Sequence, residues 1–210
     1  MMTTPAARIG LLGGSFDPPH RAHLELARSA LRALPLDAVW LIPAGQPWQR
    51  APLQADAGQR RQMLERLIAD VPGLDICTVE LERAGPSYTI DTVRDLQRRH
   101  PDCAFTLIVG ADQLSNLTSW RDWEHIVAAV DLAAAPRPGH PLRADAELVA
   151  ALTRAGHALH ALPMTPMPLS ATAARAAHGD ALRALVPEAV ARYIEHHHLY
   201  STNRKLHGHS

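Results

Sequence analysis

The stretch Arg8-Ile9-Gly10-Leu11-Leu12-Gly13-Gly14-Ser15-Phe16-Asp17-Pro18-Pro19-His20-Arg21-Ala22-His23 joins two kinds of hydrophobic pattern. Residues 8–12 form a short apolar run stopped by glycines, which is typical of a buried strand. Residues 22–34 carry apolar side chains at helical spacing, namely Leu24, Ala27, Leu31 and Leu34. The sequence therefore predicts a strand, a loop and a helix, with the loop at the carboxyl end of the strand.

This loop has the chemistry of a phosphate-binding site. Open α/β sheets bind ligands at the carboxyl ends of their strands, and the first turn of a helix presents unpaired N–H groups and a partial positive charge. His20 and His23 are three residues apart, so both imidazoles lie on one face of that turn. The loop is therefore predicted to contact a chain of phosphates.

Other interpretations of the loop fit its residues less well. A P-loop needs Gly-x-x-x-x-Gly-Lys-Ser/Thr, and the one lysine of the chain is Lys205. Gly10, Gly13 and Gly14 do not make the Gly-x-Gly-x-x-Gly of a dinucleotide site. A zinc site would lack the glutamate of His-Glu-x-x-His and a completing Cys/His cluster. Two surface histidines after a Pro-Pro turn are the remaining alternative, which leaves the glycines and the Phe-Asp-Pro step unexplained.

Length and composition favour a compact protein of the reducing cytoplasm. The 210 residues include 21 basic and 21 acidic ones, so no overall charge recruits nucleic acid or an anionic membrane. Cys77 and Cys103, both expected in strands, are too few for a disulfide framework. The longest apolar segment, 127–135, is interrupted by Asp131, and we expect neither a membrane span nor a signal peptide.

Strand-like and helical runs alternate along the chain, which predicts an α/β fold with a Rossmann-like, doubly wound parallel sheet. Residues 1–200 are expected to form a single domain, with a small C-terminal helical extension over 163–200 and a polar tail over 201–210. The expected strands are 8–12, 38–42, 74–81, 105–109, 131–135 and 157–162. The expected helices are 22–34, 57–71, 89–100, 122–130, 143–155, 171–177 and 187–198.

A second anion site is predicted late in the chain. Ser170 is placed to cap the short helix that follows it, and Thr172 and Arg175 lie three residues apart on one face. An ordinary capped helix with a surface arginine explains this segment equally well when it is taken alone. Together with the first loop, a triphosphate spanning the two helix N-termini is the better explanation.

Asp112 and Trp120 each have two interpretations. Asp112 follows a strand end and a glycine, where a carboxylate either caps the next helix or accepts hydrogen bonds from a ribose. Trp120 either anchors the core or stacks on a flat heteroaromatic ring.

The first loop resembles the signature of the nucleotidylyltransferase superfamily, Gly-x-Phe-Asp-Pro-x-His-x-Gly-His, with Ala22 in place of the second glycine. Histidine rather than threonine at position 20 resembles the adenylyltransferases of pyridine mononucleotides. Three further segments are similar to elements of the bacterial nicotinate mononucleotide adenylyltransferases, in the same order: Pro86-Ser87-Tyr88-Thr89, Gly110-Ala111-Asp112 with Thr118-Ser119-Trp120, and Leu169-Ser170-Ala171-Thr172-Ala173-Ala174-Arg175.

The resemblance implies transfer of the adenylyl group of ATP to nicotinate mononucleotide, with Mg²⁺ accompanying ATP and no dedicated protein metal site. It implies His20, His23 and Arg175 as catalytic residues. The implied ATP-binding residues are Gly13, Gly14, Ser15, Phe16, His20, His23, Gly110, Asp112, Arg137, Ser170, Thr172 and Arg175. The implied mononucleotide-binding residues are Ser15, Arg50, Tyr88, Thr89 and Trp120.

One segment departs from the family pattern. Where these enzymes tend to have Pro-Pro-His and a basic residue, this chain has Pro47-Trp48-Gln49-Arg50.

Two alternatives to the implied function stay open at this point. The enzyme could act on nicotinamide mononucleotide or on both mononucleotides, or the chain could be a nucleotide-sensing module without turnover. The sequence makes no prediction of the oligomeric state.

Overall fold

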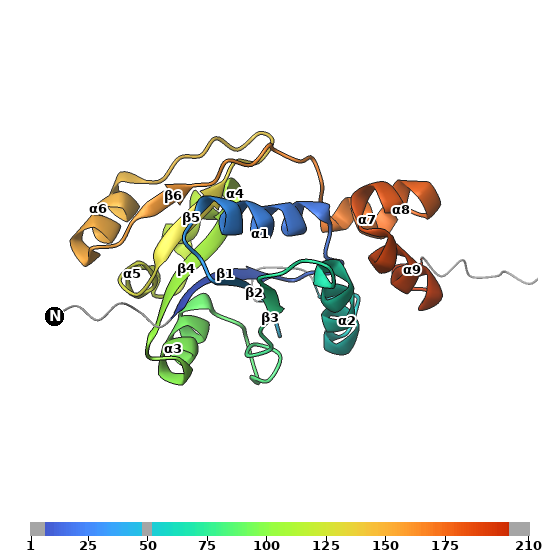
Figure 1. The fold of residues 1–210 in the computed structure, drawn as a ribbon, viewed down its shortest axis with the longest axis horizontal. Coiled ribbons are helices and arrows are strands. Elements are labelled where there is room, and N and C mark those ends of the chain that lie inside the picture. The colour runs from blue at the N-terminus through green and yellow to red at the C-terminus, as the bar shows by residue number, and fades with distance from the viewer. Residues whose placement is uncertain (1–6, 48–51, 202–210) are drawn as a thin grey trace, which may run out of the picture.

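The sheet consists of six parallel strands in the order β3-β2-β1-β4-β5-β6. A computed structural model describes residues 7–47 and 52–201, and Figure 1 shows the sheet at the centre of the molecule. The strands of this described part are β1 (Ala7–Gly14), β2 (Ala38–Pro43), β3 (Leu74–Ile76), β4 (Cys103–Gly110), β5 (Asp131–Ala135) and β6 (Leu159–Ala161). This arrangement confirms the predicted doubly wound parallel sheet.

Helices cover both faces of the sheet (Figure 1). The α-helices of the described part are α1 (Arg21–Ala33), α2 (Ala57–Ile68), α3 (Thr89–Arg99), α4 (Ala111–Leu114), α5 (Trp123–Val127), α6 (Ala146–Ala155), α7 (Ala171–Ala176), α8 (Gly179–Leu185) and α9 (Glu188–His196). Of these, α7, α8 and α9 lie beyond one end of the sheet (Figure 1). No helix in the described ranges is both long and apolar enough to cross a membrane.

Two hydrophobic cores lie on opposite faces of the sheet because side chains alternate along each strand. Leu12 belongs to the core that also contains buried residues of α1, α2 and α9. Its neighbour Leu11 belongs to the core that contains buried residues of α3, α5 and α6. Helices cover both faces of the sheet, and this explains why its strands appear in the sequence as continuous apolar runs.

Strand β1 lies at the centre of the sheet, between β2 and β4. Gly10 lies on this strand where a Cβ atom would be 2.7 Å from Ile108 Cδ1 and 2.9 Å from Val39 Cγ2, so a larger residue would displace both neighbours. The strand order reverses between β1 and β4, and a crevice at their carboxyl ends is the expected ligand site of such a sheet.

The strand expected over 74–81 is wrong in its length. Strand β3 ends at Ile76, so Cys77 lies just outside it, and residues after it form a turn in which the N–H groups of Leu81 and Glu82 donate to the Thr78 carbonyl. The alternation of apolar residues continues through this turn because Val79 packs into one of the two cores. Periodicity alone could not distinguish the turn from a longer strand.

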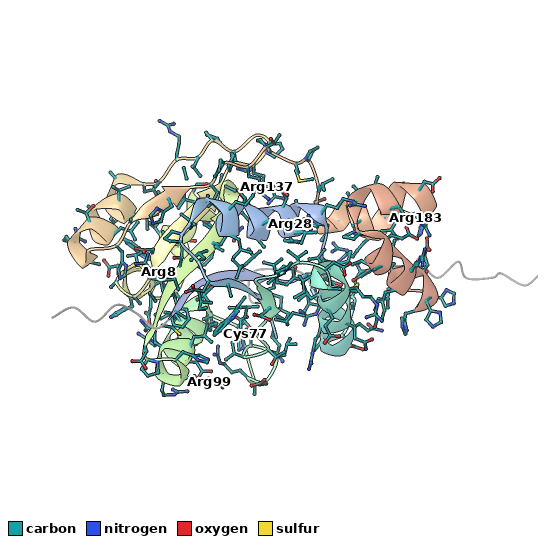
Figure 2. All side chains as sticks on the ribbon, in the orientation of Figure 1. Arg8, Arg28, Cys77, Arg99, Arg137 and Arg183 are labelled. Atoms are coloured by element: carbon teal, nitrogen blue, oxygen red, sulfur yellow. The ribbon has the colours of Figure 1, made fainter. Side chains whose placement is uncertain are left out.

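The C-terminal extension contains one helix more than expected. Helix α8 begins at Gly179, whose φ is +54°, and a glycine at the start of a segment is more typical of a turn than of a helix. Figure 2 shows Arg183 on α8 at this end of the molecule, where its guanidinium donates two hydrogen bonds of 2.8 Å to Glu195 on α9. Helix α6 also begins later than expected, at Ala146 after its N-cap Asp145.

Candidate active site

A cavity of about 640 Å³ opens at the carboxyl ends of β1 and β4. It brings together both predicted anion-binding segments, which are about 150 residues apart in the sequence. The predicted site residues that line it are Gly13, Gly14, Ser15, His20, His23, Thr89, Gly110, Asp112, Trp120, Arg137, Ser170, Thr172 and Arg175. Phe16 and Tyr88 lie beside the cavity without lining it, and the predicted Arg50 lies outside the described residues.

The two histidines of the first loop are in direct contact. His20 is the N-cap of α1, and its backbone N–H donates to Nδ1 of His23 over 3.2 Å. The two imidazole rings stack with their centroids 3.7 Å apart. Because Nδ1 of His23 accepts this hydrogen bond, the neutral ring carries its proton on Nε2. The loop thus fixes both the position and the tautomer of His23.

His20 is uncharged at neutral pH in this environment. Its side chain is buried, and burial together with the nearby charge of Arg137 lowers the pKa of His20 to about 4. Nδ1 of the ring is buried without a hydrogen-bond partner. A buried polar atom without a partner is costly, so this nitrogen marks a place where a bound group would be favoured.

The ring of Phe16 packs against the imidazole of His23. Phe16 is fully buried, its φ is +48°, and its ring meets His23 edge-on with centroids 4.9 Å apart. A Cβ atom on Gly14 would be 3.0 Å from Phe16 Cζ, so the glycine makes room for this ring. Phe16 therefore contributes to the site by packing against His23.

The second predicted segment is tied to the first by Arg175. Nη1 of Arg175 donates to the backbone carbonyl of Asp17 over 2.7 Å, and Nη2 donates to Thr172 Oγ1 over 3.2 Å. Ser170 Oγ accepts from the N–H of Ala173 over 3.1 Å, which confirms Ser170 as the N-cap of α7. The guanidinium is therefore held at the edge of the first loop.

Asp112 forms an ion pair rather than a helix cap. The residue lies inside α4, whose N-cap is Gly110, so the expected capping role is wrong. Its Oδ2 accepts from Arg137 Nη1 over 2.7 Å, while Oδ1 is buried without a partner. Burial alone would raise the pKa of Asp112, but hydrogen bonds from Gln113 and Arg137 lower it below its ordinary value. The charged carboxylate thus has one oxygen available to a hydroxyl donor.

The aromatic residues of the site differ in their positions. Trp120 lines the cavity, and its Nε1 is buried without a hydrogen-bond partner. Tyr88 is the N-cap of α3, and the guanidinium of Arg121 lies 4.7 Å from the centre of its ring. Trp120 therefore offers a ring to the cavity, whereas Tyr88 packs beside it.

Glu80, Ser87 and Thr92 line the cavity, and sequence reasoning did not identify them as a functional group. Thr92 donates to Glu80 over 2.7 Å, and Ser87 Oγ accepts from the N–H of Gly45 over 3.0 Å. Burial raises the pKa of Glu80, and its hydrogen bonds with Thr92 and Ser87 oppose that shift. No local pattern predicts a buried carboxylate in the turn after β3.

The sequence is similar to a known family over most of its length. Residues 11–177 match the cytidylyltransferase-like family model. A "Probable nicotinate-nucleotide adenylyltransferase" of Bordetella avium is 53% identical over 195 residues, covering 92% of this chain and 98% of that protein. One of Methylibium petroleiphilum is 43% identical over 210 residues, covering 97% of each.

Solved structures agree with the fold. The Plasmodium falciparum nicotinic acid mononucleotide adenylyltransferase complexed with NaAD is 20% identical, with a TM-score of 0.74 over 92% of this chain and 97% of that one. Its complex with APC gives a TM-score of 0.73 at 21% identity over the same shares. From the family match and the bacterial relatives together, this chain belongs to the cytidylyltransferase-like family and, within it, to the nicotinate-nucleotide adenylyltransferases.

Proposed function

We propose that this protein transfers the adenylyl group of ATP to nicotinate mononucleotide, giving nicotinate adenine dinucleotide and pyrophosphate in NAD biosynthesis. The observation that carries the proposal is the single cavity lined by both anion-binding segments, with buried unpartnered polar atoms on His20, Asp112 and Trp120. The names of the bacterial relatives and the NaAD complex of the structural neighbour support the same reaction.

The proposed reaction needs no general base. The 5′-phosphate of the mononucleotide is already ionised at neutral pH, and its oxygen attacks the α-phosphorus of ATP in line. The bond from that phosphorus to the bridging oxygen breaks, and pyrophosphate leaves with the electron pair. The protein must hold the two phosphates in line and stabilise the charge that develops on their oxygens.

On the ATP side, Gly13 and Gly14 end β1, Ser15 and Phe16 begin the loop that follows it, and His20 and His23 donate to the α- and β-phosphates. Ser170, Thr172 and Arg175 hold the β/γ end, since the Arg175 guanidinium lies against the carbonyl of Asp17 in that same loop. Gly110, Asp112 and Arg137 lie where the ribose and its phosphate would pass. The free Oδ1 of Asp112 supports a hydrogen bond from a ribose hydroxyl.

On the mononucleotide side, we assign Trp120 to stacking on the pyridine ring. Thr89 and Ser15 supply hydrogen bonds, and Tyr88 braces the wall from behind. Trp120 and Thr89 support this assignment because both line the same cavity as the histidines. We also propose that Arg50 binds the 5′-phosphate, and the basis for this assignment is its positive charge.

Mg²⁺ is proposed to enter with ATP. The cavity carboxylates of Asp17, Glu80 and Asp112 already accept hydrogen bonds from protein groups. No cluster of three or more His, Cys, Asp or Glu side chains within residues 7–47 and 52–201 is arranged to hold a metal ion. These contacts suit an ion that keeps its waters and phosphate ligands, and its charge would neutralise the leaving pyrophosphate.

We place the reaction in the cytoplasm, consistent with free thiols at Cys77 and Cys103.

Pyrophosphate release tests the proposed function directly. The purified protein is mixed with ATP, Mg²⁺ and either nicotinate or nicotinamide mononucleotide. We expect rapid release with the nicotinate form and much slower release with the nicotinamide form, because an amide leaves groups built for a carboxylate unpaired. Faster release with nicotinamide mononucleotide would reverse the substrate assignment. ATP binding without release under either condition would identify a nucleotide-sensing module instead.

A further inference from the structure

Asp17 connects two walls of the cavity. The residue is only 3% exposed, and its two carboxylate oxygens accept from the backbone N–H groups of Gln54 over 2.7 Å and Ala55 over 3.1 Å. Its own carbonyl accepts from Arg175. Gln54 and Arg175 both line the cavity. One residue of the first loop therefore holds the segment before α2 and the guanidinium of α7 in place.

Tyr200 donates a hydrogen bond to this same carboxylate from the far end of the described chain. Its phenolic oxygen is 2.6 Å from Asp17 Oδ1. Burial raises the pKa of Tyr200, and its hydrogen bond to Asp17 raises it further, so the phenol stays protonated and remains a donor. Tyr200 itself does not line the cavity, and its hydroxyl therefore acts on the site through Asp17.

The backbone of Tyr200 indicates that the surrounding structure holds it in place. Its φ is +61°, in the left-handed region that a bulky residue rarely adopts. Such a conformation persists only when neighbouring contacts impose it. Here it accompanies the delivery of the phenol to a buried carboxylate.

Arg60 completes the cluster around Asp17. Arg60 is only 1% exposed, and its Nη1 donates to the carbonyl of Ser15 over 2.9 Å. Burial lowers the pKa of Arg60, whereas the negative charge of Asp17 raises it. The loop from Ser15 to Asp17 is thus held by contacts from α2, from α7 and from Tyr200.

We propose that Tyr200 is a positioning residue for the adenylyl transfer proposed above, on which this inference rests. Its hydroxyl holds the Asp17 carboxylate where it fixes the backbone of Gln54 and Ala55, and so fixes the loop whose carbonyl anchors Arg175. Tyr200 touches neither nucleotide. It acts by keeping the two walls of the cavity at the spacing that in-line transfer requires.

The test removes only the hydroxyl, with the variant Tyr200→Phe. We expect kcat to fall about tenfold, because small displacements of aligned phosphates are costly to the reaction. We also expect the amide hydrogens of Gln54 and Ala55 to exchange faster with solvent, measured by mass spectrometry. Tyr193→Phe is the matched control, since this buried tyrosine of α9 contacts Arg66, with 4.3 Å from the guanidinium to the ring centre. It should leave both readouts unchanged.

A double-mutant cycle separates positioning from general support of the fold. If Tyr200 acts through the link from Asp17 to Arg175, Tyr200→Phe should cost much less than tenfold when Arg175 is already alanine. Fully multiplicative losses, an unchanged kcat, or an equal loss in Tyr193→Phe would each overturn the proposal. A wild-type protein that releases no pyrophosphate would refute the proposed function. The exchange rates at Gln54 and Ala55 would still show whether Tyr200 holds this segment.

Discussion

The protein fixes the charge state of His20 and the tautomer of His23. Burial keeps His20 neutral, and the backbone N–H of His20 fixes the tautomer of His23. Neither ring needs a positive charge to donate a hydrogen bond to a phosphate oxygen. We therefore interpret the pair as oriented donors, with the arginines supplying the permanent charge.

Removing His23 should mainly slow the chemical step. We expect His23→Ala to lower kcat by about 10²- to 10³-fold, which is typical for the loss of one transition-state donor. Steady-state pyrophosphate release measures the effect, and His125→Ala on the exposed surface of α5 serves as the control. Turnover within a few-fold of wild type would show that the histidines have another role.

The lowered pKa of His20 predicts a pH-dependent stability. The unfolded chain has a histidine pKa near 6.5, while in the folded protein it is about 4, so the unfolded state binds the proton first. The stability due to neutral His20 is complete above pH 6.5 and is lost as the pH falls towards 4, by about 3 kcal/mol at most. Urea unfolding of wild type and His20→Gln between pH 4 and 7 measures this difference, and parallel curves would contradict it.

Among single residues, the local contacts of the motif residues could be predicted from the sequence. The side chains that pack against these residues could not. Ser170 as a cap and the contact between the two histidines depend on spacing within one turn, which the sequence displays. Phe16 and Tyr88 were expected in the site, yet they pack beside the cavity. Which face a side chain presents in a loop depends on packing partners that no local pattern identifies.

At the scale of elements, helix α2 illustrates a boundary set by local hydrogen bonds. Asp56 Oδ1 accepts from the N–H of Gln59 over 2.8 Å, and Gln59 Oε1 accepts from the N–H of Asp56 over 3.0 Å. This reciprocal capping box fixes the start of the helix that carries Arg60. The sequence predicts a helix from Ala57, and in the structure this reciprocal cap is the local contact that fixes the start there.

Loss of that cap should destabilise the protein measurably. We expect Asp56→Ala to lower the free energy of unfolding by about 1 kcal/mol, because the first-turn N–H of Gln59 loses its acceptor. Urea unfolding provides the measurement. Asp102→Ala, at an exposed turn position before β4, is the control and should change the free energy by less than half as much. Equal effects would mean that the capping contact contributes nothing.

Elements whose limits depend on distant partners were predicted less well. Within the described residues, strand β3 lies at the edge of the sheet and pairs with β2 from Leu74 to Ile76, after which the chain turns away although its apolar alternation continues. Helix α8 is short, and its buried Leu182 belongs to the core shared with α1, α2 and α9. Both are stabilised by contacts made across the fold.

At the scale of the whole molecule, the C-terminal extension shares a core with the sheet. Buried residues of α9, including Val190 and Ile194, belong to the same hydrophobic cluster as Met63 and Leu64 of α2. Figure 1 shows α9 at the same end of the molecule as α2. We therefore propose that residues 1–200 unfold as a single domain.

Truncating the shared core tests this proposal. We expect Ile194→Ala to lower the free energy of unfolding by about 2–5 kcal/mol in one cooperative transition that includes the sheet. Val149→Ala, at a side chain that is 45% exposed on α6, is the control and should have little effect. Circular dichroism and tryptophan fluorescence should report the same midpoint, and two separate transitions would show that the extension folds independently.

Local sequence patterns are enough to predict the strand, loop and helix around residues 8–34, the parallel sheet, and the two segments that carry histidine, serine and arginine. These features follow from periodicity and capping, which act between residues a few positions apart. Packing across the fold is what brings Tyr200 to the Asp17 carboxylate, Arg60 to the Ser15 carbonyl and Glu80 to the cavity. Such contacts join residues far apart in the chain, so they exist only once packing has brought those residues together.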